Sequence, residues 1–182
     1  MKILVIIPAK MDSTRLEGKN MKEVNGKPLL QYSIDYAKSS KYNPDILVTS
    51  ENIKVLSYVF NQCKGIMPHQ RLRTMCGDVE VVDVYQDIIK NHPPDSYDLV
   101  VALQPDNPDR SNTLDECIDY MIENNYDDFF TVNPDYKRSG SVRIFKFNYL
   151  REGKVSKRVG CMKDEATDIH YQEDLEKVKQ KL

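Results

Sequence analysis

Three cationic side chains lie close together near the beginning of the chain, in a segment without a helix or strand pattern. They are Lys10, Arg15 and Lys19, and the same segment contains Ser13 and Asn20. Ammonium and guanidinium groups beside small polar residues provide the donors that bind phosphate oxygens. The spacing therefore indicates a site for an anion such as a polyphosphate, while simple solvation of a basic loop explains the charges equally well.

The residues before this segment favour the first interpretation. Residues 3–7 are uninterrupted and apolar, and Pro8 ends the run. Such a run is typical of a strand buried on both faces, as in a parallel sheet. Open α/β sheets bind their ligands beyond the carboxyl ends of the strands, so the cationic segment stands where such a sheet would bind an anion.

The rest of the chain alternates between strand and helix patterns. The predicted strands and helices together imply one doubly wound, mostly parallel sheet in a three-layer α/β/α domain spanning residues 1–182. We predict helices at residues 28–40, 53–62, 79–91, 112–124 and 171–182, and further strands at residues 46–48, 98–103, 128–132 and 141–147. Ser50 is expected to cap the second helix, and Ser111 or Asn112 the fourth. The strand at 141–147 alternates in polarity, which places it near an edge.

Composition narrows the class of protein. The chain has 182 residues, 40% of them hydrophobic and 30% charged, with a net charge of −2. This balance suits a soluble domain and argues against a nucleic-acid binder, which would carry a basic surface. We find no stretch long enough for a membrane span and no secretory signal. The four cysteines are scattered and form no C-x-x-C motif, which predicts reduced thiols in a cytoplasmic protein without a zinc site.

The cationic segment belongs to a longer ordered pattern. It reads I-P-A-K-x-x-S-x-R-x-x-G-K-N from Ile7 to Asn20 and continues as G-K-P-L-L from Gly26. This pattern resembles the signature of the acylneuraminate cytidylyltransferases, the CMP-sialic acid synthetases and their relatives. Two positions depart from it: Lys10 replaces an arginine, and Asp12 replaces a glycine where a carboxylate would repel phosphate unless it turned away or met a metal.

Two later segments extend the resemblance. Residues 103–110, L-Q-P-D-N-P-D-R, are similar to the family's L-Q-P-T-S-P-L-R, while Asp106 matches the magnesium-binding aspartate of the related Kdo cytidylyltransferases. Residues 168–175, D-I-H-Y-Q-E-D-L, are similar to D-I-D-T-x-E-D-L, in which both leading aspartates help to hold metal. Here the first is Asp168 and the second is His170. A turn at Asp106 and helix-entry chemistry at Asp168 are the structural alternatives.

The resemblance implies the Rossmann-like fold of the nucleotide-diphospho-sugar transferases and a specific reaction. A sialic acid-like nonulosonic sugar, or a Kdo-like sugar, would attack CTP, giving a CMP-sugar and pyrophosphate with Mg²⁺, or Mn²⁺, as cofactor. Lys10, Arg15 and Lys19 would be catalytic through the triphosphate, and Asp106, Asp168 and His170 would hold metal. The nucleotide site implied by the resemblance consists of Pro8, Ala9, Lys10, Ser13, Arg15, Lys19, Asn20, Arg71 and Gln104.

The resemblance fails at residues 133–140, where the family usually has a long excursion that carries dimer contacts and part of the sugar pocket. We therefore expect a monomer or a weak homodimer whose partners are CTP and an acidic sugar, without nucleic acid or membrane. Two other functions stay open: a sugar nucleotidyltransferase with a different base or acceptor, and a nucleotide-binding relative that has lost turnover.

Overall fold

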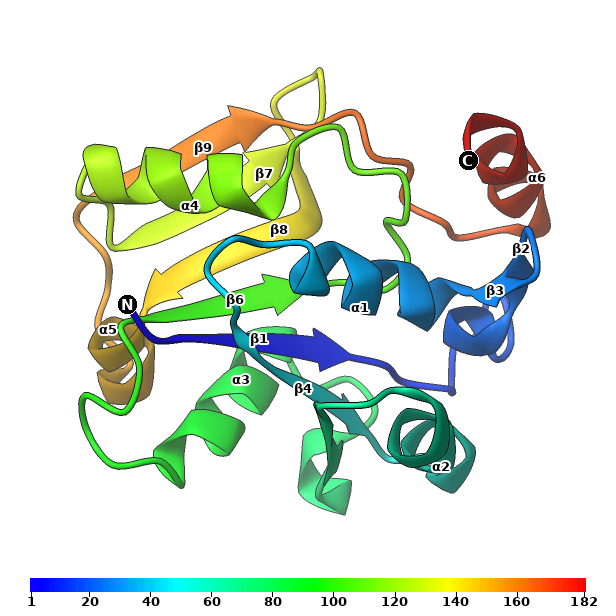
Figure 1. The fold of residues 1–182 in the computed structure, drawn as a ribbon, viewed down its shortest axis with the longest axis horizontal. Coiled ribbons are helices and arrows are strands. Elements are labelled where there is room, and N and C mark those ends of the chain that lie inside the picture. Colours follow the sequence, from blue (N-terminus) through cyan, green and yellow to red (C-terminus); the bar gives the residue numbers. More distant parts are fainter.

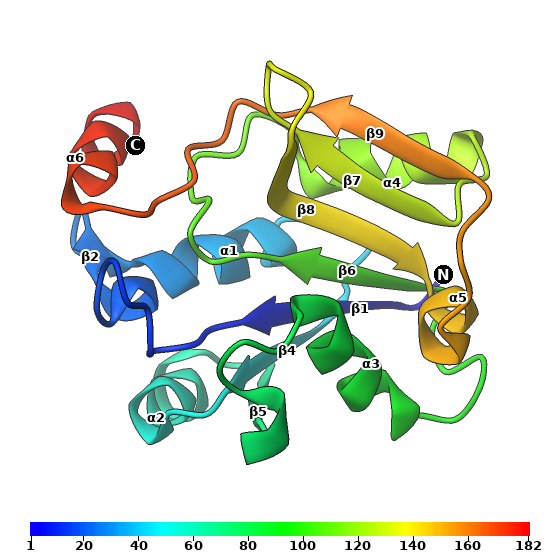
Figure 2. The same cartoon turned by 180° about the vertical axis from the view of Figure 1, so that it is seen from behind.

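The computed structural model describes residues 1–182 and contains a seven-stranded sheet in the order β5-β4-β1-β6-β8-β7-β9 (Figures 1 and 2). Strands β5, β4, β1 and β6 run parallel, β8 is antiparallel to both of its neighbours, and β7 and β9 are parallel. The strands are β1 Ile3–Pro8, β4 Asp45–Ser50, β5 Ile66–Gln70, β6 Leu99–Leu103, β7 Asp128–Val132, β8 Arg138–Lys146 and β9 Val159–Lys163.

Helices cover both faces of this sheet and confirm the three-layer α/β/α architecture. One face packs against α1 (Leu29–Lys38), α2 (Ile53–Gln62) and α4 (Leu114–Glu123), and the other against α3 (Val81–Lys90) and α5 (Phe147–Glu152). Strand β1 shows why: Ile3, Val5 and Ile7 point into the first core, while Leu4 and Ile6 point into the second. None of the helices combines the length and apolar character needed to cross a membrane.

Several elements differ from the sequence expectations. The pattern did not reveal β5, β9, α5 or the small hairpin of β2 (Glu23–Val24) and β3 (Lys27–Pro28). The cap predicted at Ser50 is provided by Asn52, whose side chain accepts a hydrogen bond from the Lys54 amide. The cap predicted at Ser111 or Asn112 is provided by Thr113, which forms a capping box with Glu116.

The strand predicted near an edge lies inside the sheet, which corrects that expectation. Strand β8 pairs with β6 on one side and β7 on the other. Its polarity alternates because α4 covers only one face of β7, β8 and β9, as Figure 2 shows from the uncovered side. A strand with one face covered by helices alternates between apolar and polar residues wherever it lies in the sheet. The alternation in β8 therefore indicates that one face is covered, and it does not indicate an edge position.

The last helix, α6 (Gln172–Lys181), is set apart from the sheet and packs against the β2–β3 hairpin (Figure 1). Leu175 and Val178 of α6 form a small buried cluster with Val24, Leu29 and Ile169. The Asp109 carboxylate ties the same region to the end of β6, because it accepts hydrogen bonds from the Thr167 amide (2.7 Å) and from Lys181 Nζ (2.8 Å). These contacts fix the segment that leads into α6 against the polar end of the sheet.

We expect Leu175→Ala to loosen α6 specifically. Removing a buried leucine side chain costs about 2–5 kcal/mol, and the small cluster around α6 has few other apolar contacts to compensate. Amide hydrogen exchange should accelerate in α6 and at Ile169 while β1 and β6 stay protected. Gln180→Ala, on the exposed side of the same helix, is the control and should leave exchange unchanged. Uniform acceleration across the whole sheet would contradict this local role.

Candidate active site

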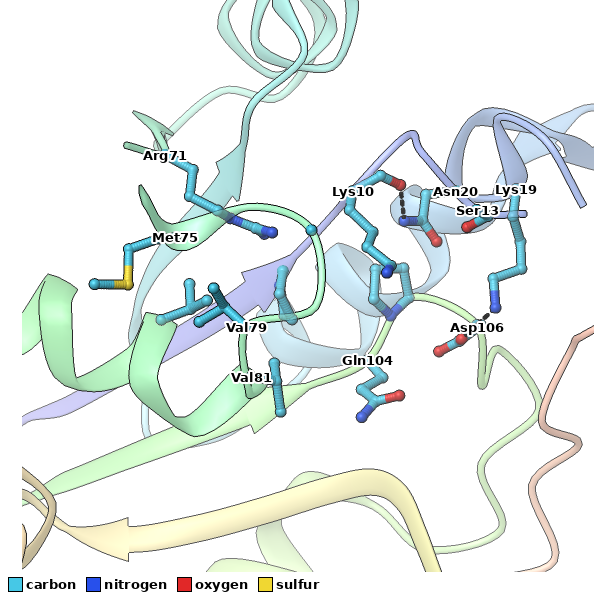
Figure 3. Close-up of a pocket in the computed structure, with 14 residues that line it drawn as sticks. Lys10, Ser13, Lys19, Asn20, Arg71, Met75, Val79, Val81, Gln104 and Asp106 are labelled. Carbon is cyan, nitrogen blue, oxygen red and sulfur yellow. Dashed lines mark hydrogen bonds and ion pairs between the residues drawn. The ribbon is translucent and has the colours of Figure 1, made fainter. Parts of the chain in front are cut away.

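The polar residues predicted from the sequence gather at the carboxyl ends of β1, β4, β5 and β6 (Figure 3). Strand β1 lies between β4 and β6, so the chain winds outward from it in two directions. Parallel α/β sheets leave a crevice at such a point because the connections on either side diverge. Pro8 at the end of β1 and Gln104 just after β6 stand on the two sides of this crevice.

Two adjoining cavities occupy the crevice. The first has a polar wall formed by Lys10, Ser13, Lys19, Asn20, Arg71, Gln104 and Asp106, an apolar wall formed by Met75, Val79, Val81 and Val84, and Pro8 among its other lining residues. The second shares Lys10, Ser13, Lys19, Gln104 and Asp106 with the first and adds Thr14, Arg15, Leu16 and His170. The shared residues therefore form the junction of an amphipathic cavity and a strongly cationic one.

A buried ion pair stands at this junction. The Lys19 ammonium lies 2.5 Å from Asp106 Oδ2 and also donates to the Ile169 carbonyl at 2.7 Å. Lys19 is only 9% exposed. Gly18 begins the turn that aims Lys19 inward: its φ of 63° suits glycine, and a Cβ there would lie 3.3 Å from the end of Met11. Asp106 Oδ1 is buried and has no hydrogen-bond partner.

Asp168 lies beside Asp106, although 61 residues separate the two along the chain. The Ile169 amide donates to the Asp106 carbonyl at 3.0 Å, which brings the two segments together. Burial, together with repulsion from the Asp106 carboxylate, raises the pKa of Asp168. His170 contacts Asp168 directly, with Nε2 2.9 Å from Asp168 Oδ2, and its buried Nδ1 has no partner.

The three predicted metal ligands do not form a complete metal site by themselves. Nowhere in the structure do three or more Cys, His, Asp or Glu side chains gather in a group that could hold a metal ion. The chemistry of the Asp106 and Asp168 carboxylates nevertheless suits a hard cation, since one buried carboxylate oxygen is unpaired and the two negative charges repel each other. Any cation here would depend on further oxygen atoms from a ligand.

The loop after β1 is folded back on itself by Asn20. Its side-chain amide donates to the Lys10 carbonyl at 2.8 Å, while Asn20 Oδ1 is buried without a partner. Asp12, which replaces the family's glycine, is exposed and has turned toward the Lys10 ammonium at 3.9 Å. Its carboxylate therefore does not line either cavity.

Gln104 is held at the end of β6 by Arg110. The Arg110 guanidinium donates to the Gln104 carbonyl at 2.7 Å and to the Ser141 carbonyl at 3.1 Å, while stacking on the Tyr36 ring. Gly140 packs against the Gln104 side chain. Its φ is 75°, and a Cβ at this position would lie 2.9 Å from Gln104 Nε2, so only glycine fits without displacing the glutamine.

Of the predicted nucleotide-binding residues, Ala9 alone lines neither cavity. It is buried, and its amide donates to the Thr49 carbonyl at 2.9 Å, so its contribution is structural. The residues that the sequence analysis missed are the apolar wall, Gly140 and the Ile169 carbonyl. The apolar wall had a signal, since Val79 and Val81 stand at the start of a predicted helix. Gly140 and the Ile169 carbonyl act through contacts between distant parts of the chain.

Comparisons with known proteins agree with this geometry. The sequence model of the family described as cytidylyltransferase matches residues 4–153. The 3-deoxy-manno-octulosonate cytidylyltransferase of Bartonella bacilliformis is 24% identical over 132 residues, covering 72% of this chain and 52% of the relative. The CMP-N,N'-diacetyllegionaminic acid synthase of Legionella pneumophila is 34% identical over 126 residues, covering 68% and 53%.

Solved structures support the fold. A CMP:2-keto-3-deoxy-manno-octonic acid synthetase complexed with CTP superposes with a TM-score of 0.77 at 14% identity, covering 99% of this chain and 98% of that one. A cytidylyltransferase from Leptospira borgpetersenii gives 0.72 at 21% identity, covering 98% and 85%. The chain spans about half the length of the curated relatives it matches. The family match and the site at the carboxyl end of the sheet together show that this chain belongs to the cytidylyltransferase family.

Proposed function

We propose that the protein is a nucleotidyltransferase that transfers CMP from CTP to an acidic sugar of the Kdo or nonulosonic class, releasing pyrophosphate. The observation that carries this proposal is the pair of cavities that meet at Lys19 and Asp106. One cavity has an apolar wall that suits a nucleoside, and the other is cationic and suits phosphates. The class of acceptor is taken from the names of the relatives. The catalytic domain would consist of residues 1–182.

The two cavities divide the nucleotide between them. In the first, the cytosine and ribose would lie between the valines of α3 and the donors of Asn20, Arg71 and Gln104. The α-phosphate would lie at the junction, within reach of Lys10 and Lys19. The β- and γ-phosphates would extend into the second cavity toward Arg15. Pro8 and Ser13 would border the nucleotide, consistent with their place in the cavity wall.

The reaction asks little covalent chemistry of these residues. The anomeric hydroxyl oxygen of the sugar forms a bond to the α-phosphorus, the bond from that phosphorus to the bridging oxygen breaks, and pyrophosphate leaves with the electron pair. The hydroxyl proton passes to solvent. Lys10, Arg15 and Lys19 would act by orienting the triphosphate and by stabilising the negative charge that develops on it.

A divalent cation, Mg²⁺ or Mn²⁺, is part of the proposal. Asp106 and Asp168 would hold it, with His170 maintaining the position of Asp168 through their 2.9 Å contact. When bound, such a cation would neutralise phosphate charge and lower the pKa of the attacking hydroxyl. Imidazole is a poorer ligand than carboxylate for magnesium, so with Mg²⁺ His170 would contact Asp168 and not the ion. With Mn²⁺, which accepts imidazole more readily, His170 would coordinate the ion directly.

A further cavity, on the face of β8 that α4 leaves uncovered, offers a place for an acidic acceptor, and Arg138 and Arg143 are among the residues that line it. Arg143 on β8 pairs across the sheet with Ala102, two residues before Gln104. Arg138 stacks on the Phe130 ring, with its guanidinium carbon 4.1 Å from the ring centroid, and has no acidic partner. The Arg138 guanidinium therefore suits a carboxylated sugar, whereas the Arg143 guanidinium already donates to the Asp128 carboxylate at 2.8 Å.

The remaining parts of the proposal concern assembly and location. Residues 133–137 form a short hairpin turn, with the Asn133 amide bonded to the Lys137 carbonyl at 2.8 Å, which leaves little chain to reach a second subunit. We propose a monomer or a weak homodimer. The cysteines are all free, which suits the cytoplasm, where CTP is made.

Pyrophosphate release tests the function directly. The protein should release pyrophosphate from CTP with Mg²⁺ when Kdo or a nonulosonic acid is present, and not with a neutral hexose. Release from another nucleoside triphosphate would show a different sugar nucleotidyltransferase. Binding of CTP without release under any acceptor would show a nucleotide-binding relative without turnover.

We expect Lys19→Ala to weaken CTP binding by about 1.5–3 kcal/mol, the usual value of a hydrogen bond to a charged group. The loss should be similar for CTP and CDP if Lys19 reaches the α-phosphate. Calorimetry with both nucleotides measures this. Lys22→Ala removes the same charge three residues away, from a side chain that lines neither cavity, and serves as the control. Equal affinity of Lys19→Ala and Lys22→Ala would refute the phosphate role.

We expect Gly140→Ala to impair nucleotide binding through Gln104. The substitution brings a Cβ to 2.9 Å from Gln104 Nε2 and also strains a residue with φ of 75°. Gly65→Ala is the matched control, because its φ is 76° and its Cβ would meet nothing within 4 Å. Both variants should lose about 1–2 kcal/mol of unfolding free energy from the left-handed backbone, but only Gly140→Ala should lose CTP affinity. Identical CTP affinities in the two variants would show that Gln104 is not a nucleotide contact.

A further inference from the structure

A carboxylate just beyond the middle one of three neighbouring strands contacts both the loop after β1 and Arg71, which lines the first cavity. Glu51 directly follows β4, which lies between β1 and β5 in the sheet. Glu51 Oε1 accepts a hydrogen bond of 2.7 Å from the amide of Met11, in the loop after β1. Glu51 Oε2 lies 4.0 Å from Nη1 of Arg71, which directly follows β5. Glu51 itself lines neither cavity, so any effect that it has on a ligand is exerted through the residues that it contacts.

Arg71 is enclosed but incompletely bonded. Its residue is 8% exposed, and Nη2 donates to the Thr49 carbonyl at 3.1 Å. Its Nε is buried without a hydrogen-bond partner, and Glu51 Oε2 is buried without one as well. A guanidinium this far from water needs a nearby negative charge, and Glu51 is the acidic side chain that provides it.

Arg71 differs from the other cations of the site in lining only the first cavity. Lys10, Arg15 and Lys19 line the cationic second cavity, where phosphate oxygens would lie, although Lys10 and Lys19 also have acidic partners of their own. Arg71 lines the amphipathic cavity beside Met75 and has its charge offset by Glu51. An offset guanidinium with an unused N–H suits a neutral acceptor, such as a carbonyl oxygen or ring nitrogen of a base. An isolated guanidinium would attract the triphosphate of any nucleotide.

We propose that Glu51 is a positioning residue that determines base specificity through Arg71. Its carboxylate holds the guanidinium in place and offsets its charge. Arg71 then donates hydrogen bonds to the base, while Lys10, Arg15 and Lys19 bind the phosphates. This inference rests on the proposed function, in which the first cavity takes the nucleoside. The competing explanation is that Glu51 only anchors the loop through the Met11 amide.

The substitution Glu51→Gln separates the two explanations. Glutamine keeps an oxygen that can accept from the Met11 amide but removes the charge opposite Arg71. We expect the preference for CTP over UTP to fall by roughly tenfold, because base discrimination depends on polar groups held in place. Binding of inorganic tripolyphosphate should become tighter, since Arg71 then presents an uncompensated charge. Calorimetry with Mg²⁺ present measures all three ligands.

Two further variants make the test decisive. Glu80→Gln makes the same chemical change at an exposed residue between Val79 and Val81 of the cavity wall, and should leave the preference unchanged. In an Arg71→Ala background, Glu51→Gln should have no further effect on the CTP-to-UTP ratio if Glu51 acts through Arg71. Circular dichroism of each variant checks that the fold is retained.

The outcomes distinguish this inference from the function beneath it. An unchanged CTP-to-UTP ratio in Glu51→Gln, an equal fall in Glu80→Gln, or a further fall in the Arg71→Ala background would each overturn the role of Glu51 while leaving the nucleotide site intact. A native protein without preference for CTP would overturn both the base assignment and the role of Glu51.

Discussion

The buried contact between Lys19 and Asp106 is the interaction on which the arrangement of the site depends. Removing two charges from water is costly, and the cost is offset only where geometry and further hydrogen bonds are good. Here the ammonium meets a carboxylate and a backbone carbonyl at 2.5 Å and 2.7 Å. These two contacts join three regions that are distant in sequence: the loop after β1, the end of β6 and the segment before α6. The crevice therefore keeps its shape because a charge pair occupies its centre.

The strongest elements of the fold were predictable because their pattern has one physical cause. Residues 3–7 and 99–103 are buried on both faces of the sheet, so they form continuous apolar runs in the sequence. Strand β5 lacks that pattern, since it is an edge strand that carries Pro68 and His69. Strand β9 is the other edge and is partly exposed, and α5 has only 6 residues, too few for helical periodicity to show. The missed elements are those whose burial is incomplete or whose length is short.

In the site, too, some residues could be located from a local sequence pattern, whereas others are brought together only by contacts between distant segments. Lys10 to Asn20 and Gln104 to Asp106 each follow a strand directly, so strand prediction alone places them at one edge of the sheet. Asp168 follows no predicted strand, and only its motif suggested a place near Asp106. Gly140 and Glu51 act through side chains or backbone brought together by the strand order β5-β4-β1-β6-β8. The sequence of a single segment does not indicate the strand order, so the contacts of Gly140 and Glu51 could be found only in the structure.

Under the proposed function, the charges of the site would couple the binding of the nucleotide to the binding of a metal ion. Lys10 faces Asp12 at 3.9 Å, Lys19 faces Asp106 at 2.5 Å and Arg71 faces Glu51 at 4.0 Å, whereas Arg15 has no acidic partner and lies near the Tyr171 ring. A triphosphate that bound Lys19 would replace the Asp106 carboxylate as the anionic partner of the ammonium group. The exchange also leaves Asp106 beside Asp168 without a countercharge. A buried carboxylate in that position must gain a proton or a cation. Under the proposed function, a divalent cation shared with the phosphates would satisfy this need, so the ion pair between Lys19 and Asp106 would make nucleotide and cation favour each other's binding.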